Sequence, residues 1–361
     1  MRNAQARRVL GGEFETSGPL CLGASSGRLG LERGLGGTWV ASGRAGLFLI
    51  LRKLRRSGVR QVHLPAYLCE SVLLPIKALG LDFSFYPVEA SLTARPDPPR
   101  DSAVVLLHYF GWLNPASAVL RSQGAASFHL VEDFSHALLS EWGNVEERRE
   151  GLHLFFSARK LGPAPLGGWC TAEAEPGKPS TEMELAAWRS LAARLLKRDY
   201  LASPDAAVDP KVEDLYLSAF EAVESFLNAR PDEAALPAFV LDLVAGLDWQ
   251  DIAERRRSNW MTVHDLLAGT VEPLAPDLPS DTVPLGYVVR LDEEKRDNVR
   301  RALADRRIFC PVHWPLPKEV DRRRFPEARR LSRTLLTLPI DQRYGEAEME
   351  IVANELRRAL G

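Results

Sequence analysis

Residues 152–168 read LHLFFSARKLGPAPLGG and combine an apolar strand with a serine and a lysine at its end. Ser157 precedes Lys160 by three residues. At that spacing the hydroxyl can bind a phosphate while the amine reaches an aldehyde on the same ligand. Gly167 and Gly168 would let the following segment pass close to the lysine. Because most serine–lysine pairs at this spacing are solvated side chains, the interpretation depends on the rest of the chain.

The segments before this stretch alternate between apolar strands and helices. Strands are expected at 59–65, 83–87, 103–109, 129–132 and 152–157, and helices at 43–55 and 70–79. Such alternation predicts an α/β fold with a mostly parallel, doubly wound sheet, and fully apolar strands suit a sheet that is covered on both faces.

The second half of the chain has a different pattern. It is helical and charged over 180–267, then short extended segments are expected at 285–291 and 307–312 and a final amphipathic helix at 345–360. We therefore predict an N-terminal arm (1–38), a large domain (39–250) and a small C-terminal α+β domain (251–361).

The composition is that of an ordinary globular protein. The 361 residues are 45% hydrophobic and 26% charged with a formal net charge of -2, which argues against nucleic acid or an anionic membrane as the main partner. No apolar run is long enough for a membrane span, and no secretory signal is expected. Cys21, Cys69, Cys170 and Cys310 show no paired spacing, so they indicate reduced thiols in a cytoplasmic protein. No metal site is expected, because no ligand spacing is found.

A candidate anion site lies at the start of the helix expected at 43–55. Ser42 is a natural N-cap, and Gly43 lets the backbone approach a ligand closely. Arg44 puts a positive charge at the positive end of the helix dipole, which is unfavourable unless an anion such as phosphate docks there. A surface arginine that points away from the helix end is the alternative.

A candidate acidic site follows the strand expected at 129–132. Residues 131–136 read VEDFSH, and ligands of open α/β sheets bind at the carboxyl ends of the strands. Asp133 could hold a pyridine nitrogen protonated, and His136 could reach the same ligand. The alternative is an acidic helix cap with a structural histidine.

Five segments in this order resemble the DegT/DnrJ/EryC1/StrS aminotransferases, which are pyridoxal phosphate (PLP) enzymes of fold type I. The segments are LPAYLC (64–69), HYFG (108–111), VEDFSH (131–136), FSARK (156–160) with Gly167 and Gly168, and LPI (338–340). The resemblance runs from about residue 39 to the C-terminus and is weakest between residues 175 and 245.

The resemblance implies a role for each candidate residue. Lys160 would carry PLP as a Schiff base and act in catalysis, Asp133 would pair with the pyridinium nitrogen, and His136 would lie beside the ring. Ser157 with the Gly43–Arg44 turn would hold the phosphate. Tyr67 is the nearest candidate for stacking on the ring, although a strict register places Cys69 there. The implied activity moves an amino group from a glutamate-like donor to an oxo-sugar, nucleotide-linked in most of the family, in a homodimer.

The chain departs from the family at several points. Arg44 stands where threonine is common, and the Gly-Tyr-Asn-Tyr-Arg segment that contributes to the neighbouring subunit's site is missing. Two alternatives therefore remain: a PLP enzyme that acts on an amino acid, and a catalytically silent binding protein with this fold. Among further candidates, His313 could border the substrate, Arg255–Arg257 is interpreted as a solvated helix face, and Arg343 as a structural ion pair.

Overall fold

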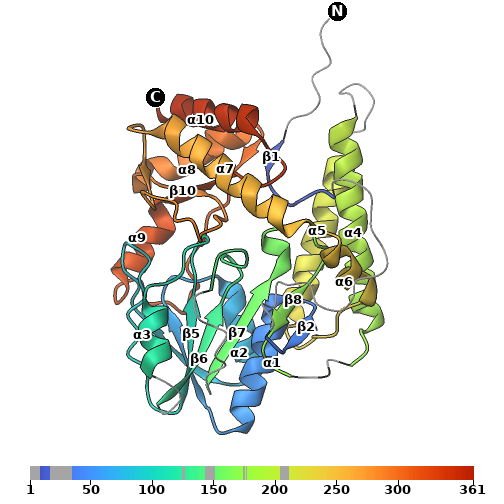
Figure 1. Ribbon diagram of the computed structural model, residues 1–361, viewed down its shortest axis with the longest axis vertical. Helices are drawn as coiled ribbons and strands as arrows, with labels where there is room; N and C mark the ends of the chain where they lie inside the picture. Colours follow the sequence, from blue (N-terminus) through green and yellow to red (C-terminus); the bar gives the residue numbers. More distant parts are fainter. Residues whose placement is uncertain are drawn as a thin grey trace, which may run out of the picture.

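Seven strands form the large sheet at the base of the molecule (Figure 1). The computed structural model describes residues 9–16, 35–123, 127–142, 151–173, 175, 177–203 and 211–361. The strands are β2 (Thr38–Val40), β3 (Gln61–Pro65), β4 (Asp82–Tyr86), β5 (Ser102–Leu107), β6 (Phe128–Asp133), β7 (Leu152–Ser157) and β8 (Gly168–Cys170). Their order is β2-β8-β7-β6-β5-β3-β4. The five strands from β7 to β4 are parallel, whereas β8 and β2 are antiparallel to their neighbours.

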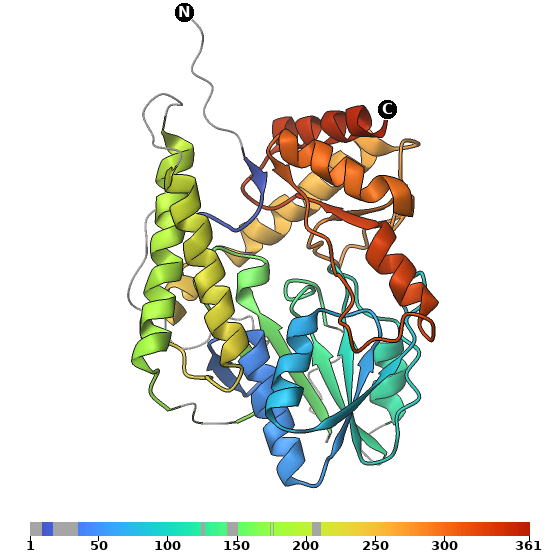
Figure 2. The same ribbon diagram turned by 180° about the vertical axis from the view of Figure 1, so that it is seen from behind.

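Both faces of this sheet are covered, as the apolar strands predicted. On β7, Phe155 packs into the core on the side of α1 (Gly43–Arg56), while Leu154 and Phe156 pack into a second core with α4 (Thr181–Ala202). The remaining helices of this half are η1 (Glu70–Val72), α2 (Leu73–Ala78), α3 (Ala116–Gln123), η2 (Ala158–Lys160), α5 (Lys211–Ala229) and α6 (Ala238–Ala245). Helices α4 and α5 pack side by side as a long hairpin beside the sheet (Figures 1 and 2).

The C-terminal residues form a second, smaller sheet with its own core. Strands β9 (Glu272–Pro273), β10 (Tyr287–Arg290) and β12 (Leu335–Leu338) pair antiparallel. Helices α7 (Trp249–Leu267), α8 (Glu293–Asp305), α9 (Pro326–Thr334) and α10 (Glu346–Leu360) accompany them. The buried side chains of α7, α8 and α10 meet those of β10 and β12 in one cluster. The predicted domain boundary near residue 250 stays a prediction, and α7 begins at that point of the chain.

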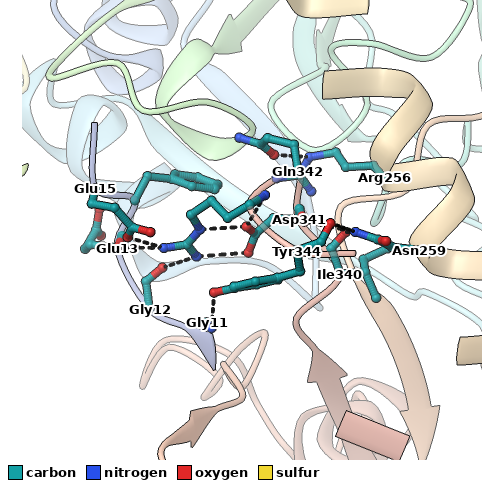
Figure 3. Close-up of polar contacts among 12 residues, drawn as sticks. Gly11, Gly12, Glu13, Glu15, Arg256, Asn259, Ile340, Asp341, Gln342 and Tyr344 are labelled. Carbon is teal, nitrogen blue, oxygen red and sulfur yellow. Dashed lines mark hydrogen bonds and ion pairs between the residues drawn. The ribbon is translucent and has the colours of Figure 1, made fainter. Parts of the chain in front are cut away.

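The N-terminal segment 9–16 lies against this C-terminal half. Its strand β1 (Leu10–Gly11) pairs in parallel with β11 (Ile308–Phe309). Arg343 donates hydrogen bonds to the carbonyls of Gly12 and Glu13 and forms an ion pair with Glu15 (Figure 3). Residues 1–8 and 17–34 of the predicted arm lie outside the described residues, and Cys21 is among them.

Most expected elements are present with shifted ends. The expected helix 43–55 is α1, and the expected strand 152–157 matches β7. Strands β1, β2, β8, β9 and β12 were not expected, because segments of two to four residues are too short to show a period. Helices α3, α8 and α9 were also not expected, and α8 has 13 residues. Within the described ranges, no helix combines the length and apolarity that a membrane crossing needs.

Candidate active site

A cavity of about 130 Å³ lies where β6 and β7 end and α1 begins. Six of the seven residues predicted from the sequence line it: Gly43, Arg44, Asp133, His136, Ser157 and Lys160. They meet because the parallel strands β6 and β7 are neighbours with Asp133 paired to Phe155, so their carboxyl ends share one edge of the sheet. The remaining residue, Tyr67, does not line the cavity.

Lys160 lies beside two buried imidazoles. Its Nζ is 3.4 Å from His136 Nε2. Burial lowers the pKa of His136 well below its ordinary value, and Lys160 and His313 lower it further. Burial, with Lys160, also lowers the pKa of His313 to about 3. Both imidazoles are therefore neutral at neutral pH, so an unprotonated ring nitrogen of His136 can accept a hydrogen bond from the Lys160 amine.

Asp133 and Glu132 point to opposite sides of β6, as the alternation along a strand requires. Asp133 lines the cavity and accepts a hydrogen bond of 2.8 Å from the Ser135 backbone N–H. Burial raises its pKa, although Ser135 and Lys160 act in the opposite direction. Glu132 is fully buried away from the cavity and is held by Ser117 and Arg121 at 2.5 and 2.8 Å. Asp133 is thus the acid that a ligand in the cavity can reach.

The start of α1 forms an anion-binding cup. Ser42 caps the helix by accepting a hydrogen bond from the Ala45 N–H. The N–H groups of Gly43 and Arg44, the first two residues of the helix, have no helical acceptor. A Cβ on Gly43 would come within 3.5 Å of the Ser135 hydroxyl and within 3.4 Å of Ser157 Cβ, so both serines lie close to the helix end. Backbone N–H groups, the helix dipole and two hydroxyls in one corner suit a phosphate.

Arg44 resolves its conflict with the helix dipole in a way that the sequence did not indicate. Its guanidinium forms an ion pair of 2.8 Å with Glu224 of α5 and donates a hydrogen bond to Asn228. Glu224 also accepts a hydrogen bond of 3.1 Å from Arg159. Both Arg159 and Glu224 line the cavity and were missed, because nothing in the pattern of a helix shows which acid faces a distant arginine.

Tyr67 needs a correction as the ring-stacking candidate. It is fully buried and packs against Tyr109 and Trp314, with ring centroids 5.8 and 5.4 Å apart. Tyr67 therefore lies behind the cavity wall. Trp314, which it contacts, and Cys69 line the cavity, whereas Tyr67 does not. Cys69, which the strict sequence register favoured, is among the residues that line the cavity.

Two further cavities, of about 150 and 460 Å³, also have Lys160 in their walls. Both are bordered by Gly12 and Phe14 of the N-terminal segment and by Phe309 of β11. His313 lines the smaller one, and its proximity to a substrate stays a prediction. Lys160 thus separates the anion-binding cavity from the more open cavities that a substrate could enter.

Two arginine predictions have different outcomes. Arg256 is 1% exposed and donates to the carbonyls of Leu161 and Leu285, so the interpretation of Arg255–Arg257 as a solvated face is wrong at its central residue. Arg343 forms the expected structural ion pair, with its Nε 2.6 Å from Asp341 (Figure 3).

The cavity fits the cofactor that the resemblance implied. It places a lysine amine, a carboxylate and an anion-binding cup around one space. Two buried nitrogens in its wall, Arg159 Nε and His136 Nδ1, have no hydrogen-bond partner in the protein. Since an unsatisfied buried donor is costly, such atoms indicate a ligand that supplies the partner.

No protein-family model and no curated protein sequence matches the chain. Solved structures do match. The aminotransferase TlmJ from Streptoalloteichus hindustanus is 21% identical, with 98% of this chain and 99% of that chain covered and a TM-score of 0.67. Spr1654 from Streptococcus pneumoniae, a candidate sugar aminotransferase solved in its PLP form, is 16% identical, with 97% and 93% covered and a TM-score of 0.66.

A DegT DnrJ EryC1 StrS aminotransferase from Brucella abortus is also similar, at 16% identity with 91% of this chain and 87% of that chain covered and a TM-score of 0.62. These likenesses confirm the predicted fold: the chain has the architecture of PLP-dependent aminotransferases of fold type I over nearly its whole length. The resemblance first indicated by five short segments therefore holds at the level of the fold.

Proposed function

We propose that this protein is a PLP-dependent aminotransferase that transfers an amino group from a glutamate-like donor to an oxo-sugar. The observation that carries the proposal is the single cavity shared by Lys160, Asp133 and the anion-binding cup at Gly43 and Ser157. These groups correspond to the three parts of PLP that a protein must bind, namely the aldehyde, the ring nitrogen and the phosphate. Bound PLP supplies an aldehyde that amines attack and a ring that accepts electrons from the neighbouring carbon.

The residues divide the work as follows. Lys160 tethers the cofactor and, when its amine is free, moves a proton from one carbon to another. The Asp133 carboxylate keeps the ring nitrogen protonated, which maintains the ring as an electron acceptor. The cup at Gly43 and Ser157 holds the phosphate, so that the reacting bond stays aligned with Lys160 Nζ. His136, neutral because of its lowered pKa, lies beside the Lys160 amine without adding a second positive charge and can accept a hydrogen bond from it.

The acceptor is proposed to be an oxo-sugar, and specifically a nucleotide-linked one. The likeness to Spr1654, a candidate sugar aminotransferase, supports a sugar, and the segments shared with the DegT/DnrJ/EryC1/StrS aminotransferases support the nucleotide. The cavity of about 460 Å³ beside Lys160 offers room for a large substrate next to two arginines, Arg159 and Arg300.

We also propose that the protein is a homodimer and cytoplasmic. Large apolar side chains are exposed on the α4–α5 hairpin, namely Leu185, Trp188, Leu215 and Leu217. Exposed apolar groups of this size on one element are typical of an interface. The cytoplasmic location rests on the free thiols of Cys69, Cys170 and Cys310. Sedimentation of a stable monomer that still binds PLP would contradict the dimer.

The test of the function is cofactor attachment followed by transfer. Purified protein is incubated with PLP, reduced with borohydride and digested, and the modified peptide is located by mass spectrometry; we expect the adduct on Lys160 and none in Lys160→Ala. A separate sample, loaded with PLP but not reduced, is given glutamate, followed by a nucleotide-linked oxo-sugar or by a 2-oxo acid. Amination of the sugar supports the proposal, whereas amination of the 2-oxo acid alone indicates an amino-acid enzyme. Absence of an adduct would contradict catalysis and favour the silent binding protein.

A further inference from the structure

Three charged side chains from three separate segments meet at one end of the cavity. Arg44 belongs to α1, Arg159 to η2 and Glu224 to α5. Each carboxylate oxygen of Glu224 holds one guanidinium, at 2.8 Å for Arg44 and 3.1 Å for Arg159. The two arginines lie side by side because this carboxylate lies between them. We call the three residues the arginine clamp.

The clamp keeps a net positive charge. Burial alone would raise the pKa of Glu224, but Arg159 and Arg44 outweigh it and lower the pKa to about 2. Glu224 is therefore ionised at neutral pH, and one negative charge faces two positive ones beside the positive end of the α1 dipole. The excess positive charge lies in the wall of the cavity, where an anion can reach it.

Arg159 also has an unused donor. Its guanidinium meets Glu224 through one terminal nitrogen, while its Nε is buried and has no hydrogen-bond partner. Arg44, in contrast, uses both terminal nitrogens, on Asn228 and Glu224. An ion pair that only fastened α5 to α1 and η2 would have no need to lie in a cavity wall or to leave a buried donor without a partner.

We propose that Arg159 binds the cofactor phosphate and that Glu224 is a positioning residue that holds Arg159 and Arg44 together at the cup. This inference rests on the proposed function for the identity of the anion. A simple electrostatic account predicts the opposite effect of removing Glu224 on anion binding. A carboxylate next to a phosphate site should weaken anion binding, so its removal should strengthen binding; if Glu224 positions the arginines, its removal weakens binding instead.

The test compares PLP with pyridoxal, which lacks the phosphate. Dissociation constants of both are measured by quenching of tryptophan fluorescence in the parent protein, in Arg159→Gln and in Glu224→Gln. Arg255→Gln is the matched control, since Arg255 is an exposed arginine paired with Asp251 on α7 and lies outside the cavity. The ratio of the two constants isolates what the phosphate contributes in each variant.

We expect Arg159→Gln to weaken PLP binding by about tenfold or more and to leave pyridoxal binding unchanged, since hydrogen bonds to charged groups are the strong ones. Glu224→Gln should change the ratio in the same direction, and Arg255→Gln should not change it. An unchanged ratio in Arg159→Gln would overturn the assignment of Arg159. Tighter PLP binding by Glu224→Gln would overturn the positioning role.

Inorganic phosphate separates failure of this inference from failure of the proposed function. If the parent protein forms no adduct with PLP, the function fails, but phosphate should still raise the melting temperature of the parent and not of Arg159→Gln. If the adduct forms and phosphate stabilises both proteins equally, the function stands and the clamp is structural. A lower melting temperature of both variants without ligand, with the PLP-to-pyridoxal ratio unchanged, would likewise show a purely structural role.

Discussion

Replacement of Asp133 by asparagine tests the proposed chemistry most directly. The change removes the negative charge at the end of β6 but keeps the size of the side chain and an oxygen that can accept the Ser135 hydrogen bond. Because Lys160 and the phosphate cup are untouched, cofactor binding should survive. Transfer should not, because a neutral amide does not hold the ring nitrogen protonated and the ring then accepts electrons poorly.

The size of the loss follows from the surroundings of Asp133. Its carboxylate lies in a site where burial raises its pKa, so the charge is poorly screened by water. Two unit charges about 4 Å apart interact by roughly 4 kcal/mol at the effective dielectric constant typical of proteins. If about 3 kcal/mol of that energy is lost from the transition state, the rate falls by about two orders of magnitude.

The assay is the half-reaction with glutamate, followed by the change in cofactor absorbance, with Glu132→Gln as the control. Glu132 is buried against Ser117, Arg121 and His108 on the other side of β6, so its replacement should lower stability and leave the half-reaction rate per loaded site close to that of the parent. A normal rate in Asp133→Asn with an inactive Glu132→Gln would refute the assignment of the carboxylate. Normal rates in both would place the cofactor away from this strand.

Three further outcomes are expected. Asp341→Asn should destabilise the protein by about 1–3 kcal/mol in urea unfolding, because it removes one of the two carboxylates that pair with the Arg343 guanidinium and leaves Glu15 as the other, and segment 9–16 should exchange its amide hydrogens faster. The stability difference between the parent and Glu224→Gln should shrink as the pH falls from 4.5 toward 2. The lowered pKa of Glu224 stabilises the fold at pH values above 4.5, the ordinary pKa of a glutamate, and this stabilisation disappears as Glu224 is protonated. Urea unfolding across that pH range measures the difference. Tyr67→Phe should leave PLP affinity unchanged in a fluorescence titration, whereas Trp314→Ala should lower it, since Trp314 lines the cavity and Tyr67 does not.

The predicted residues that line the cavity are those whose position follows from local structure. Asp133 ends the buried strand β6 and Lys160 comes three residues after the end of β7, and parallel strands bring their carboxyl ends to one edge. Gly43 follows a serine cap, and such a cap marks the start of a helix from neighbouring residues alone. In these cases a short stretch of chain determines where the side chain lies.

The residues that were missed depend on contacts between distant segments. Glu224 is one acid among several on α5, and only the packing of α5 beside α1 and η2 makes it the partner of two arginines. Arg256 stands between two arginines in the sequence, and only the packing of α7 against the chain near Leu161 and Leu285 buries it. No period or motif in the sequence carries this information.

The location of Glu224 changes the meaning of the stretch that resembles the family least. Helix α5 lies within residues 175–245, where the resemblance is weakest, and the family's Gly-Tyr-Asn-Tyr-Arg segment is missing from the chain. Yet this stretch supplies the acid that binds Arg44 and Arg159 at the anion-binding cup. Glu224 thus makes this stretch part of the cavity wall, although the stretch carries the least of the resemblance.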